Sequence, residues 1–270
     1  MPSVPERVIV REVGLRDGLQ SIRTILPTER KKAWIRAAHA AGQREIEVGS
    51  FVPAKLLPQL ADTDPLVEFA KTLPGLVVSV LVPNLKGAER ALASGADVMM
   101  VPLSASHAHS LANLRKTPDE VIAEVGRMRA ARDASGAPTL IEGGIGTAFG
   151  CTIQGEVKPS EVLRCLEALL DAGVDRVSIA DTVGFAGPGA VRALFEQART
   201  VAGERFSCGH FHDTRGLALA NVYAALETGQ DFDALLALRQ KVARWLEGET
   251  LHGTLWRAGL PKTMRQEQPA

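Results

Sequence analysis

His210 and His212 flank a single phenylalanine in the stretch GHFHDTRG, in a chain that has six histidines. Residues i and i+2 of a β-strand point to the same face, so a strand here would project both imidazoles together. Two neutral imidazoles on one face can bind a divalent cation if a carboxylate and open coordination positions complete the site. A lone histidine is more often a hydrogen-bonded core residue, but this pair, followed by Asp213 and Thr214, favours a metal site.

A carboxylate that can complete such a site is Asp17, in the stretch REVGLRDGLQ. Mixed nitrogen and oxygen ligation suits Mg²⁺, Mn²⁺ or Zn²⁺, so Asp17, His210 and His212 are the predicted ligands. Glu47 can pair with Arg16 beside them, since a buried carboxylate is costly unless it is paired. A structural ion pair and a catalytic role are equally compatible with the position of Glu47.

Seven short apolar or β-branched runs are candidate strands, and segments rich in Ala, Leu, Glu and Arg separate them. The candidate strands are residues 8–13, 44–49, 77–82, 97–101, 139–145, 176–180 and 206–211. The candidate helices are residues 28–41, 86–94, 117–134, 159–172, 187–202 and 214–228. Strict alternation over one domain-sized length predicts a parallel sheet covered by helices.

A (β/α)₈ TIM barrel is the predicted fold, and a doubly wound open sheet is the alternative. Neither G-x-G-x-x-G nor a P-loop follows the first candidate strand, which disfavours the open sheet. In a parallel barrel the chemistry collects at the C-terminal ends of the strands. Arg16, Asp17, Glu47 and the histidine pair all fall there, and so does Asp181, which can cap the following loop or accept a hydrogen bond from a substrate hydroxyl.

The composition is that of an ordinary globular protein. The 270 residues are 46% hydrophobic and carry equal numbers of basic and acidic side chains, 31 each, so no bulk charge attracts nucleic acid or a membrane. No apolar run is long enough to span a bilayer, and no secretory signal or transit peptide is evident, so we expect a cytoplasmic location. Three cysteines without a metal-site or disulfide pattern predict reduced thiols.

The same motifs resemble a known family. VGLRDGLQ, IEVGSFVPAKLLPQLAD, VPNLKG, DTVG and HFHDTRGLALAN occur in the order and spacing of the 3-hydroxy-3-methylglutaryl-CoA lyases, members of the DRE-TIM metallolyases. The resemblance covers residues 8–228. It implies a divalent cation, Mg²⁺ or Mn²⁺, and retro-Claisen cleavage of a 3-hydroxyacyl-CoA into acetyl-CoA and acetoacetate. It also implies a homo-oligomer, dimer or tetramer, acting in leucine degradation and ketone-body formation.

The resemblance also assigns roles to individual residues. It makes Asp17, His210 and His212 the metal ligands, with Arg16 stabilising the enolate oxygen of the departing acetyl thioester and Glu47 supporting the metal site. The chemistry agrees, because cleavage requires a deprotonated tertiary alcohol and a stabilised enolate. Substrate-contacting positions of the family correspond to Ser50, Ser178 and Asp181.

One departure from the family follows the fourth candidate strand. The lyases have Ser-Glu there, whereas this chain has SASHAHSLANL, which places His107 and His109 near the predicted mouth of the barrel. The change can alter the acyl group that is accepted. The alternative is that both histidines are solvent-exposed loop residues, since loops are commonly polar.

A second departure follows LANVYAALETG, where an eighth strand and a glycine-rich loop with a catalytic cysteine and a metal-binding asparagine are due. The chain continues instead with QDFDALLALRQKVARWLEGETL, which has a helical pattern, and no cysteine matches the catalytic position. We therefore regard residues 1–270 as a single barrel domain and predict that Gln230 and Asp231 are not adjacent in the natural protein.

Three other functions remain compatible with these motifs. Two are enzymes of the same superfamily, a citramalyl-CoA-type lyase and a Claisen-condensing acyl synthase. The synthases carry a long C-terminal regulatory portion, and we expect none here. The third is a metal-binding or CoA-binding homologue without catalytic activity, which gains support if the cysteine loop is absent.

Overall fold

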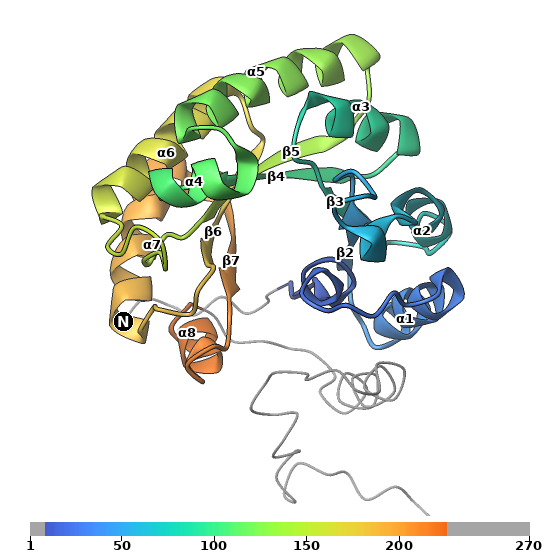
Figure 1. Ribbon diagram of the computed structural model, residues 1–270, viewed down its shortest axis with the longest axis horizontal. Helices are drawn as coiled ribbons and strands as arrows, with labels where there is room; N and C mark the ends of the chain where they lie inside the picture. Colours follow the sequence, from blue (N-terminus) through green and yellow to red (C-terminus); the bar gives the residue numbers. More distant parts are fainter. Residues whose placement is uncertain (1–8, 226–270) are drawn as a thin grey trace, which may run out of the picture.

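The computed structural model describes residues 9–225, and these residues contain a curled sheet of seven parallel strands in the order β1-β2-β3-β4-β5-β6-β7 (Figure 1). The strands are β1 (Arg11–Glu12), β2 (Glu45–Ser50), β3 (Val77–Leu81), β4 (Val98–Ser104), β5 (Leu140–Gly146), β6 (Arg176–Asp181) and β7 (Phe206–Phe211). Each strand pairs with the next one along the chain, as in a TIM barrel. The predicted barrel fold is confirmed, and the doubly wound alternative is wrong because the order of the strands never reverses.

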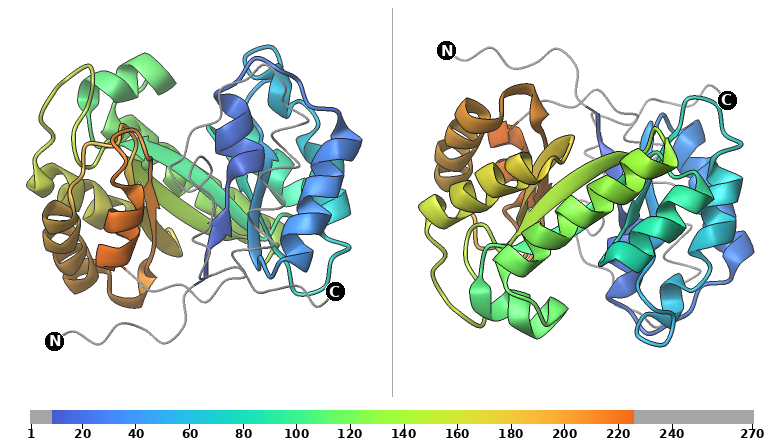
Figure 2. Two further views of the ribbon diagram at one scale, coloured as in Figure 1. Left: turned by 90° about the horizontal axis from the view of Figure 1, so that it is seen from below. Right: turned by 90° about the horizontal axis from the view of Figure 1, so that it is seen from above.

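Helices cover the convex side of the sheet, as the two additional views show (Figure 2). They are α1 (Thr28–Ala40), α2 (Thr63–Ala70), α3 (Leu85–Ser94), α4 (His107–Leu114), α5 (Pro118–Ser135), α6 (Pro159–Ala172), α7 (Pro188–Ala202) and α8 (Ala218–Ala225). Local sequence sets several of their ends. Thr117 and Glu120 form a reciprocal capping box at the start of α5, and Gly173 ends α6 in the left-handed conformation.

The core lies between the sheet and these helices. The strands are rich in Val, Ile and Leu because both faces of a parallel sheet of this kind are covered. Val78, Val80, Ile141 and Ile179 are completely buried in this layer. The strand pairing is parallel throughout, so all seven C-terminal strand ends meet at one end of the barrel.

The first strand is shorter than predicted. The sequence predicts an extended segment over residues 8–13, but of the described residues 9–13 only Arg11–Glu12 pair with β2, and a π-helical turn, η1 (Gly14–Gly18), follows at once. The Glu12 carboxylate accepts a hydrogen bond from the Gly14 amide, 2.5 Å away, which draws the chain into the turn. A side chain at Gly14 would collide with Glu12 and Trp34, so only glycine allows this tight exit from the strand.

Two helices were missed by the sequence prediction. The first is α2, a short helix that follows a 3₁₀ turn, η2 (Pro58–Leu60), and begins at Thr63, whose hydroxyl donates to the Leu60 carbonyl at 2.8 Å. The second is α4, where Ser106 caps the helix by accepting a hydrogen bond from the His109 amide. Both are eight residues long, too short for periodicity alone to reveal them.

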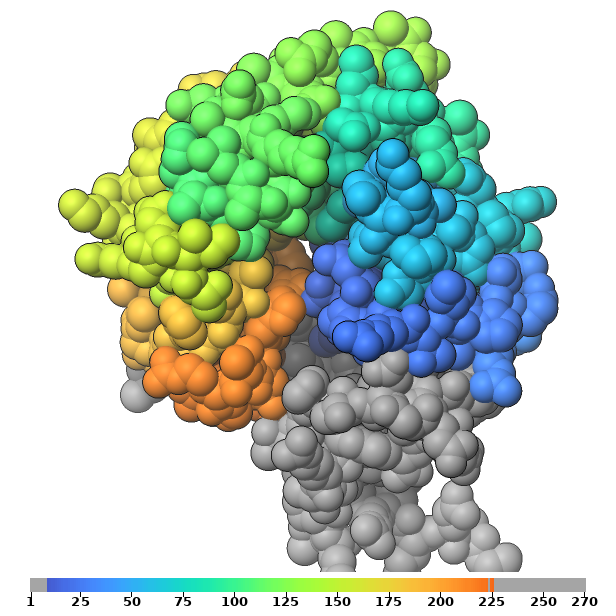
Figure 3. All heavy atoms as spheres, viewed as in Figure 1, coloured from blue at the N-terminus to red at the C-terminus, as the bar shows by residue number. Residues whose placement is uncertain are grey.

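The ends of the ring are formed by the first and last described elements. Viewed along the barrel, α1 and η1 lie across a narrow central hollow from β7 and α8 (Figure 3). The junction of Gln230 and Asp231 lies outside the described residues, so the predicted missing segment stays a prediction. No helix within residues 9–225 is long and apolar enough to cross a membrane.

Candidate metal centre and active site

Asp17, His210 and His212 come together at the C-terminal end of the barrel. Asp17 lies on η1, His210 is near the end of β7, and His212 follows that strand directly. The Nε2 atoms of the two histidines are 3.1 Å apart, and each lies 3.5 Å from the same Asp17 Oδ2. The histidine pair thus projects to one side, as the i, i+2 spacing predicts, and the turn after the first strand supplies the carboxylate.

These three side chains fit a divalent cation. Ligand atoms that bind one ion at about 2.0–2.2 Å lie roughly 3.0–3.5 Å from one another, which is the spacing seen here. All three candidate ligand atoms lie within 4.8 Å of one another. The side chains are 24–35% exposed, so an ion and a substrate can reach them. Oxygen and imidazole ligands suit Mg²⁺, Mn²⁺ or Zn²⁺.

The protonation states also favour cation binding. Burial opposes ionisation of Asp17, but hydrogen bonding to His210 and the charge of Arg16 outweigh it and hold the pKa of Asp17 well below its usual range. Burial, followed by the charge of His210, lowers the pKa of His212 below the usual value for histidine. At neutral pH the site therefore offers a carboxylate and a neutral His212, the forms that bind metal.

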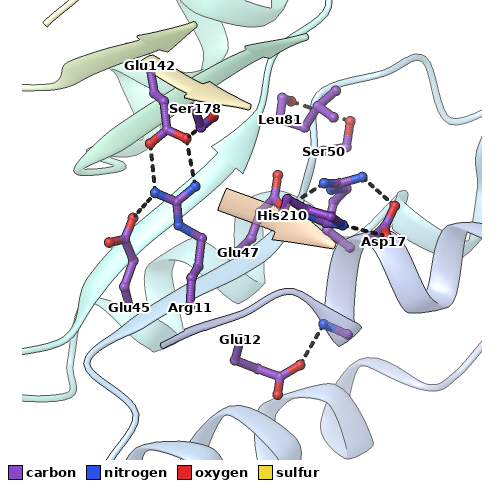
Figure 4. A network of polar contacts seen from close by, with 12 residues as sticks. Arg11, Glu12, Asp17, Glu45, Glu47, Ser50, Leu81, Glu142, Ser178 and His210 are labelled. Carbon is purple, nitrogen blue, oxygen red and sulfur yellow. Dashed lines mark hydrogen bonds and ion pairs between the residues drawn. The ribbon is translucent and has the colours of Figure 1, made fainter. Parts of the chain in front are cut away.

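Arg16 and Glu47 lie beside the metal ligands. The guanidinium binds Asp17 Oδ1 at 2.8 Å through Nη1 and Glu47 Oε2 at 2.9 Å through Nη2. Asp17 and Glu47 are labelled in Figure 4. Arg16 is 6% and Glu47 1% exposed, so this is a buried pair with excellent geometry. Glu47 Oε1 and Arg16 Nε have no hydrogen-bond partner among the described residues, which leaves polar capacity for a bound molecule.

The three predicted substrate-contacting residues are all buried among protein partners. Asp181 accepts hydrogen bonds from the amides of Phe185 and Ala186, both at 2.9 Å, so it caps the loop after β6. Ser178 donates to Glu142, 2.8 Å away, deep in the barrel. Ser50 accepts a hydrogen bond from the Val52 amide at 3.2 Å. Their contact with substrate stays a prediction, and the structure shows a second, structural role for each.

His107 and His109 are not loop residues, because both belong to α4. His107 is exposed. His109 is half-buried, with Nδ1 3.0 Å from the Ser104 hydroxyl, and burial lowers its pKa. The expectation of two solvent-exposed loop side chains is therefore wrong for His109, which packs against the end of β4.

Two of the three cysteines, Cys165 and Cys208, do not supply a reactive thiolate. Burial raises the pKa of Cys208 to about 11 and that of Cys165 to about 12, so both thiols stay protonated at neutral pH. Cys151 lies in the loop after β5, where its sulfur accepts hydrogen bonds from the amides of Ile153 and Gln154. All three are free cysteines, as the sequence predicted.

Two supporting residues escaped the sequence analysis. Gly184, in the DTVG motif, has a positive φ of 71°, and a side chain there would collide with Thr214 and the His212 carbonyl. Gly184 therefore allows the loop after β6 to approach the loop after β7 closely, next to His212. Asn221, 1% exposed on α8, donates to the Ala186 carbonyl and ties the helix to the same loop. The sequence signal for this role was that Asn221 is a polar residue inside the apolar stretch ALANV.

We expect His210→Ala and His212→Ala each to lower the affinity for Mn²⁺ by about ten-fold or more, because even loss of an outer-sphere partner costs this much. Isothermal titration calorimetry measures the effect. His39→Ala is the matched control, since His39 lies on α1, next to the Pro74 carbonyl, and is not one of the proposed ligands. Unchanged affinity in both test variants would exclude the site.

The affinity for Mn²⁺ is also expected to depend on pH in one direction. The lowered pKa of His212 keeps its imidazole neutral at and above pH 7, so affinity should be nearly constant there. Below about pH 6 protons compete for the His212 imidazole, and affinity should fall. Titrations from pH 5 to 8 provide the measurement, and an affinity that rises on acidification would contradict the assignment.

Comparison with known proteins agrees with this geometry. The HMGL-like family pattern matches residues 7–232. The chain is 36% identical over 226 residues to the mitochondrial hydroxymethylglutaryl-CoA lyase of Arabidopsis thaliana, covering 84% of this chain and 48% of that protein. It is 37% identical over 228 residues to the 3-hydroxy-3-isohexenylglutaryl-CoA/hydroxy-methylglutaryl-CoA lyase of Pseudomonas aeruginosa, covering 84% of this chain and 75% of that protein.

Solved structures show the same relationship. An HMG-CoA lyase from Acinetobacter baumannii, in complex with coenzyme A and 3-methylmalate, superimposes with a TM-score of 0.88 at 29% identity, covering 100% of both chains. The fold and site thus define a TIM-barrel lyase. The chain belongs to the HMGL-like family, and it is an enzyme of this lyase kind.

Proposed function

We propose that this protein is a metal-dependent retro-Claisen lyase that cleaves 3-hydroxy-3-methylglutaryl-CoA, or a close 3-hydroxyacyl-CoA, to acetyl-CoA and a keto acid. Acetoacetate is the keto acid from the parent substrate. The observation that carries the proposal is the convergence of Arg16 with the Asp17, His210 and His212 cluster at the barrel mouth. Cleavage leaves negative charge on the thioester oxygen, and a buried guanidinium beside a cation site is suited to stabilise it.

The proposed roles follow from the contacts. Asp17, His210 and His212 would hold Mg²⁺ or Mn²⁺, or Zn²⁺. When bound, the cation supplies positive charge that favours loss of the substrate hydroxyl proton. Arg16 would donate hydrogen bonds to the enolate oxygen of the acetyl thioester as the carbon–carbon bond to the future keto acid breaks. Glu47 would fix the direction of the Arg16 guanidinium, which it contacts at 2.9 Å.

The substrate class is supported by the relatives. The Acinetobacter structure contains coenzyme A, and the Pseudomonas relative carries two acyl-CoA substrates in its name. We propose an acyl-CoA thioester as the small-molecule partner, and assembly as a dimer or tetramer in the cytoplasm. Ser50, Ser178 and Asp181 remain the proposed substrate-binding residues.

The test is incubation of the full-length protein with Mg²⁺ and 3-hydroxy-3-methylglutaryl-CoA while acetoacetate and acetyl-CoA are measured together. The proposal requires the two products in equal amounts and their loss after chelation with EDTA. Citramalyl-CoA and the isohexenyl homologue serve as competing substrates. Faster cleavage of either would reassign the acyl group, and activity unaffected by EDTA would exclude metal dependence.

A second candidate is a protein that binds a cation and an acyl-CoA without cleaving the acyl group. The absence of the family's cysteine loop motif from the sequence favours it. Binding of Mn²⁺ and of the acyl-CoA, measured by calorimetry, without acetoacetate release during prolonged incubation, would support this second candidate over the lyase.

A further inference from the structure

We propose that Arg11 is a positioning residue that holds Arg16 and Asp17 in place through ion pairs that cross the interior of the barrel. The inference rests on the proposed function for its catalytic consequence. Its structural part concerns how the short β1 is fixed, and it can be tested without substrate.

The need for such a residue comes from the shortness of β1. Only Arg11 and Glu12 pair with β2, and β1 is an edge of the sheet within the described residues. The turn η1 then follows, with the Arg16 and Asp17 amides donating to the Val13 carbonyl at 3.1 and 2.8 Å. A two-residue ladder is a weak anchor for a turn that carries two site residues.

Arg11 supplies the missing anchor. Its guanidinium makes a bidentate pair with Glu142 of β5, at 2.9 and 2.7 Å, and also lies 2.9 Å from Glu45 of β2. Figure 4 shows this cluster on one side of Glu47, with Asp17 and His210 on the other. Glu142 is 131 residues away in sequence, so the side chain ties the first strand to the fifth.

A second arginine binds the same two carboxylates from another strand. Arg176 of β6 contacts Glu45 at 2.5 Å and Glu142 at 2.7 Å. We call Arg11, Glu45, Glu142 and Arg176 the ionic floor. Of these two arginines, only Arg11 lies on the strand that leads into η1. The effects of replacing Arg11 and of replacing Arg176 can therefore be compared directly.

Burial makes the Arg11 contact strong and specific. Glu142 is completely buried, and Ser178 donates a further hydrogen bond to it. Burial alone would raise the pKa of Glu142, but the hydrogen bond and charge of Arg11 outweigh it and hold that pKa below its usual value. Both charges are therefore present at neutral pH, and a planar bidentate contact fixes direction as well as distance.

The experiment compares Arg11→Met with Arg176→Met, which removes the other arginine of the ionic floor. Hydrogen exchange of the metal-free proteins is followed for residues 13–19, and Mn²⁺ affinity is measured by calorimetry. We expect exchange in this segment to be about ten-fold faster in Arg11→Met, the scale of a lost charge-assisted hydrogen bond, and to change little in Arg176→Met. Mn²⁺ affinity should fall about ten-fold in Arg11→Met only.

Arg11→Lys keeps the charge without the bidentate contact, and it decides the question if Arg11→Met does not fold. It should show the same pattern with smaller changes. Equal exchange and equal affinity in the Arg11 and Arg176 variants would overturn the proposal and leave the ionic floor with a general role in stability. Absence of Mn²⁺ binding by the wild type would count against the proposed function alone, because the exchange measurement decides the positioning role independently.

Discussion

Arg16→Lys is expected to lower kcat for the proposed lyase reaction by about 10²–10³-fold, the usual cost of removing one donor from a developing oxyanion. Arg16 uses one nitrogen for Asp17 and another for Glu47, at 2.8 and 2.9 Å. A lysine ammonium is a compact charge without this planar fork, so it cannot hold both carboxylates and also face the substrate. Steady-state kinetics with 3-hydroxy-3-methylglutaryl-CoA provide the measurement.

The control for this substitution is Arg90→Lys, which changes an arginine paired with Asp64 on the outer surface. It should leave kcat unchanged, since exposed ion pairs contribute little. Both variants should keep the circular dichroism spectrum of the wild type. Wild-type turnover in Arg16→Lys would show that Arg16 is only a structural partner of Glu47.

Asp17→Ala is expected to reduce turnover further, by about 10³-fold or more. The substitution removes the only carboxylate of the proposed metal centre, and a catalytic cation supplies several kcal/mol of charge stabilisation, which corresponds to about three powers of ten in rate. It also leaves Arg16 with one carboxylate partner instead of two. Turnover and Mn²⁺ content, the latter by atomic absorption after dialysis, should fall together.

The control is a variant that loses an exposed carboxylate instead, because it changes the net charge by the same amount without touching the proposed metal centre. Asp64→Ala removes the surface partner of Arg90 and should retain both turnover and Mn²⁺ content. If Asp17→Ala kept its Mn²⁺ but lost turnover, Asp17 would act on the substrate rather than on the ion. If it kept both, the proposed metal centre would be wrong.

Much of the barrel could be predicted because its signals are local. Short stretches of consecutive residues are enough to recognise apolar runs of strand length and the helices between them. The same holds for the glycines that end the helices and for the capping box at Thr117. The strand parity that places His210 and His212 together is likewise local, since it depends only on the two-residue repeat of extended backbone. The family motifs then supplied the order in which these elements meet.

The prediction was weakest where the backbone responds to contacts between distant segments. Gly14 allows the turn η1 because a side chain at this position would collide with Glu12 and Trp34, and α4 begins where Ser106 can cap it. The ionic floor was not predicted as a unit, because Arg11 and Glu142 are 131 residues apart. Neither local sequence indicates that the two side chains are partners. Only the curvature of the sheet in the folded chain makes them neighbours.

The sequence by itself therefore determined the repeating strands and helices, the residue types of the site and the shared face of the two histidines. The tertiary structure decided that Asp17 meets both imidazoles at 3.5 Å, that Asp181 caps a loop and that Arg11 crosses the barrel to Glu142. The physical reason is the range of the interactions. Backbone propensity and side-chain periodicity act over a few residues, whereas hydrogen bonds and ion pairs depend on distances that only the folded chain establishes.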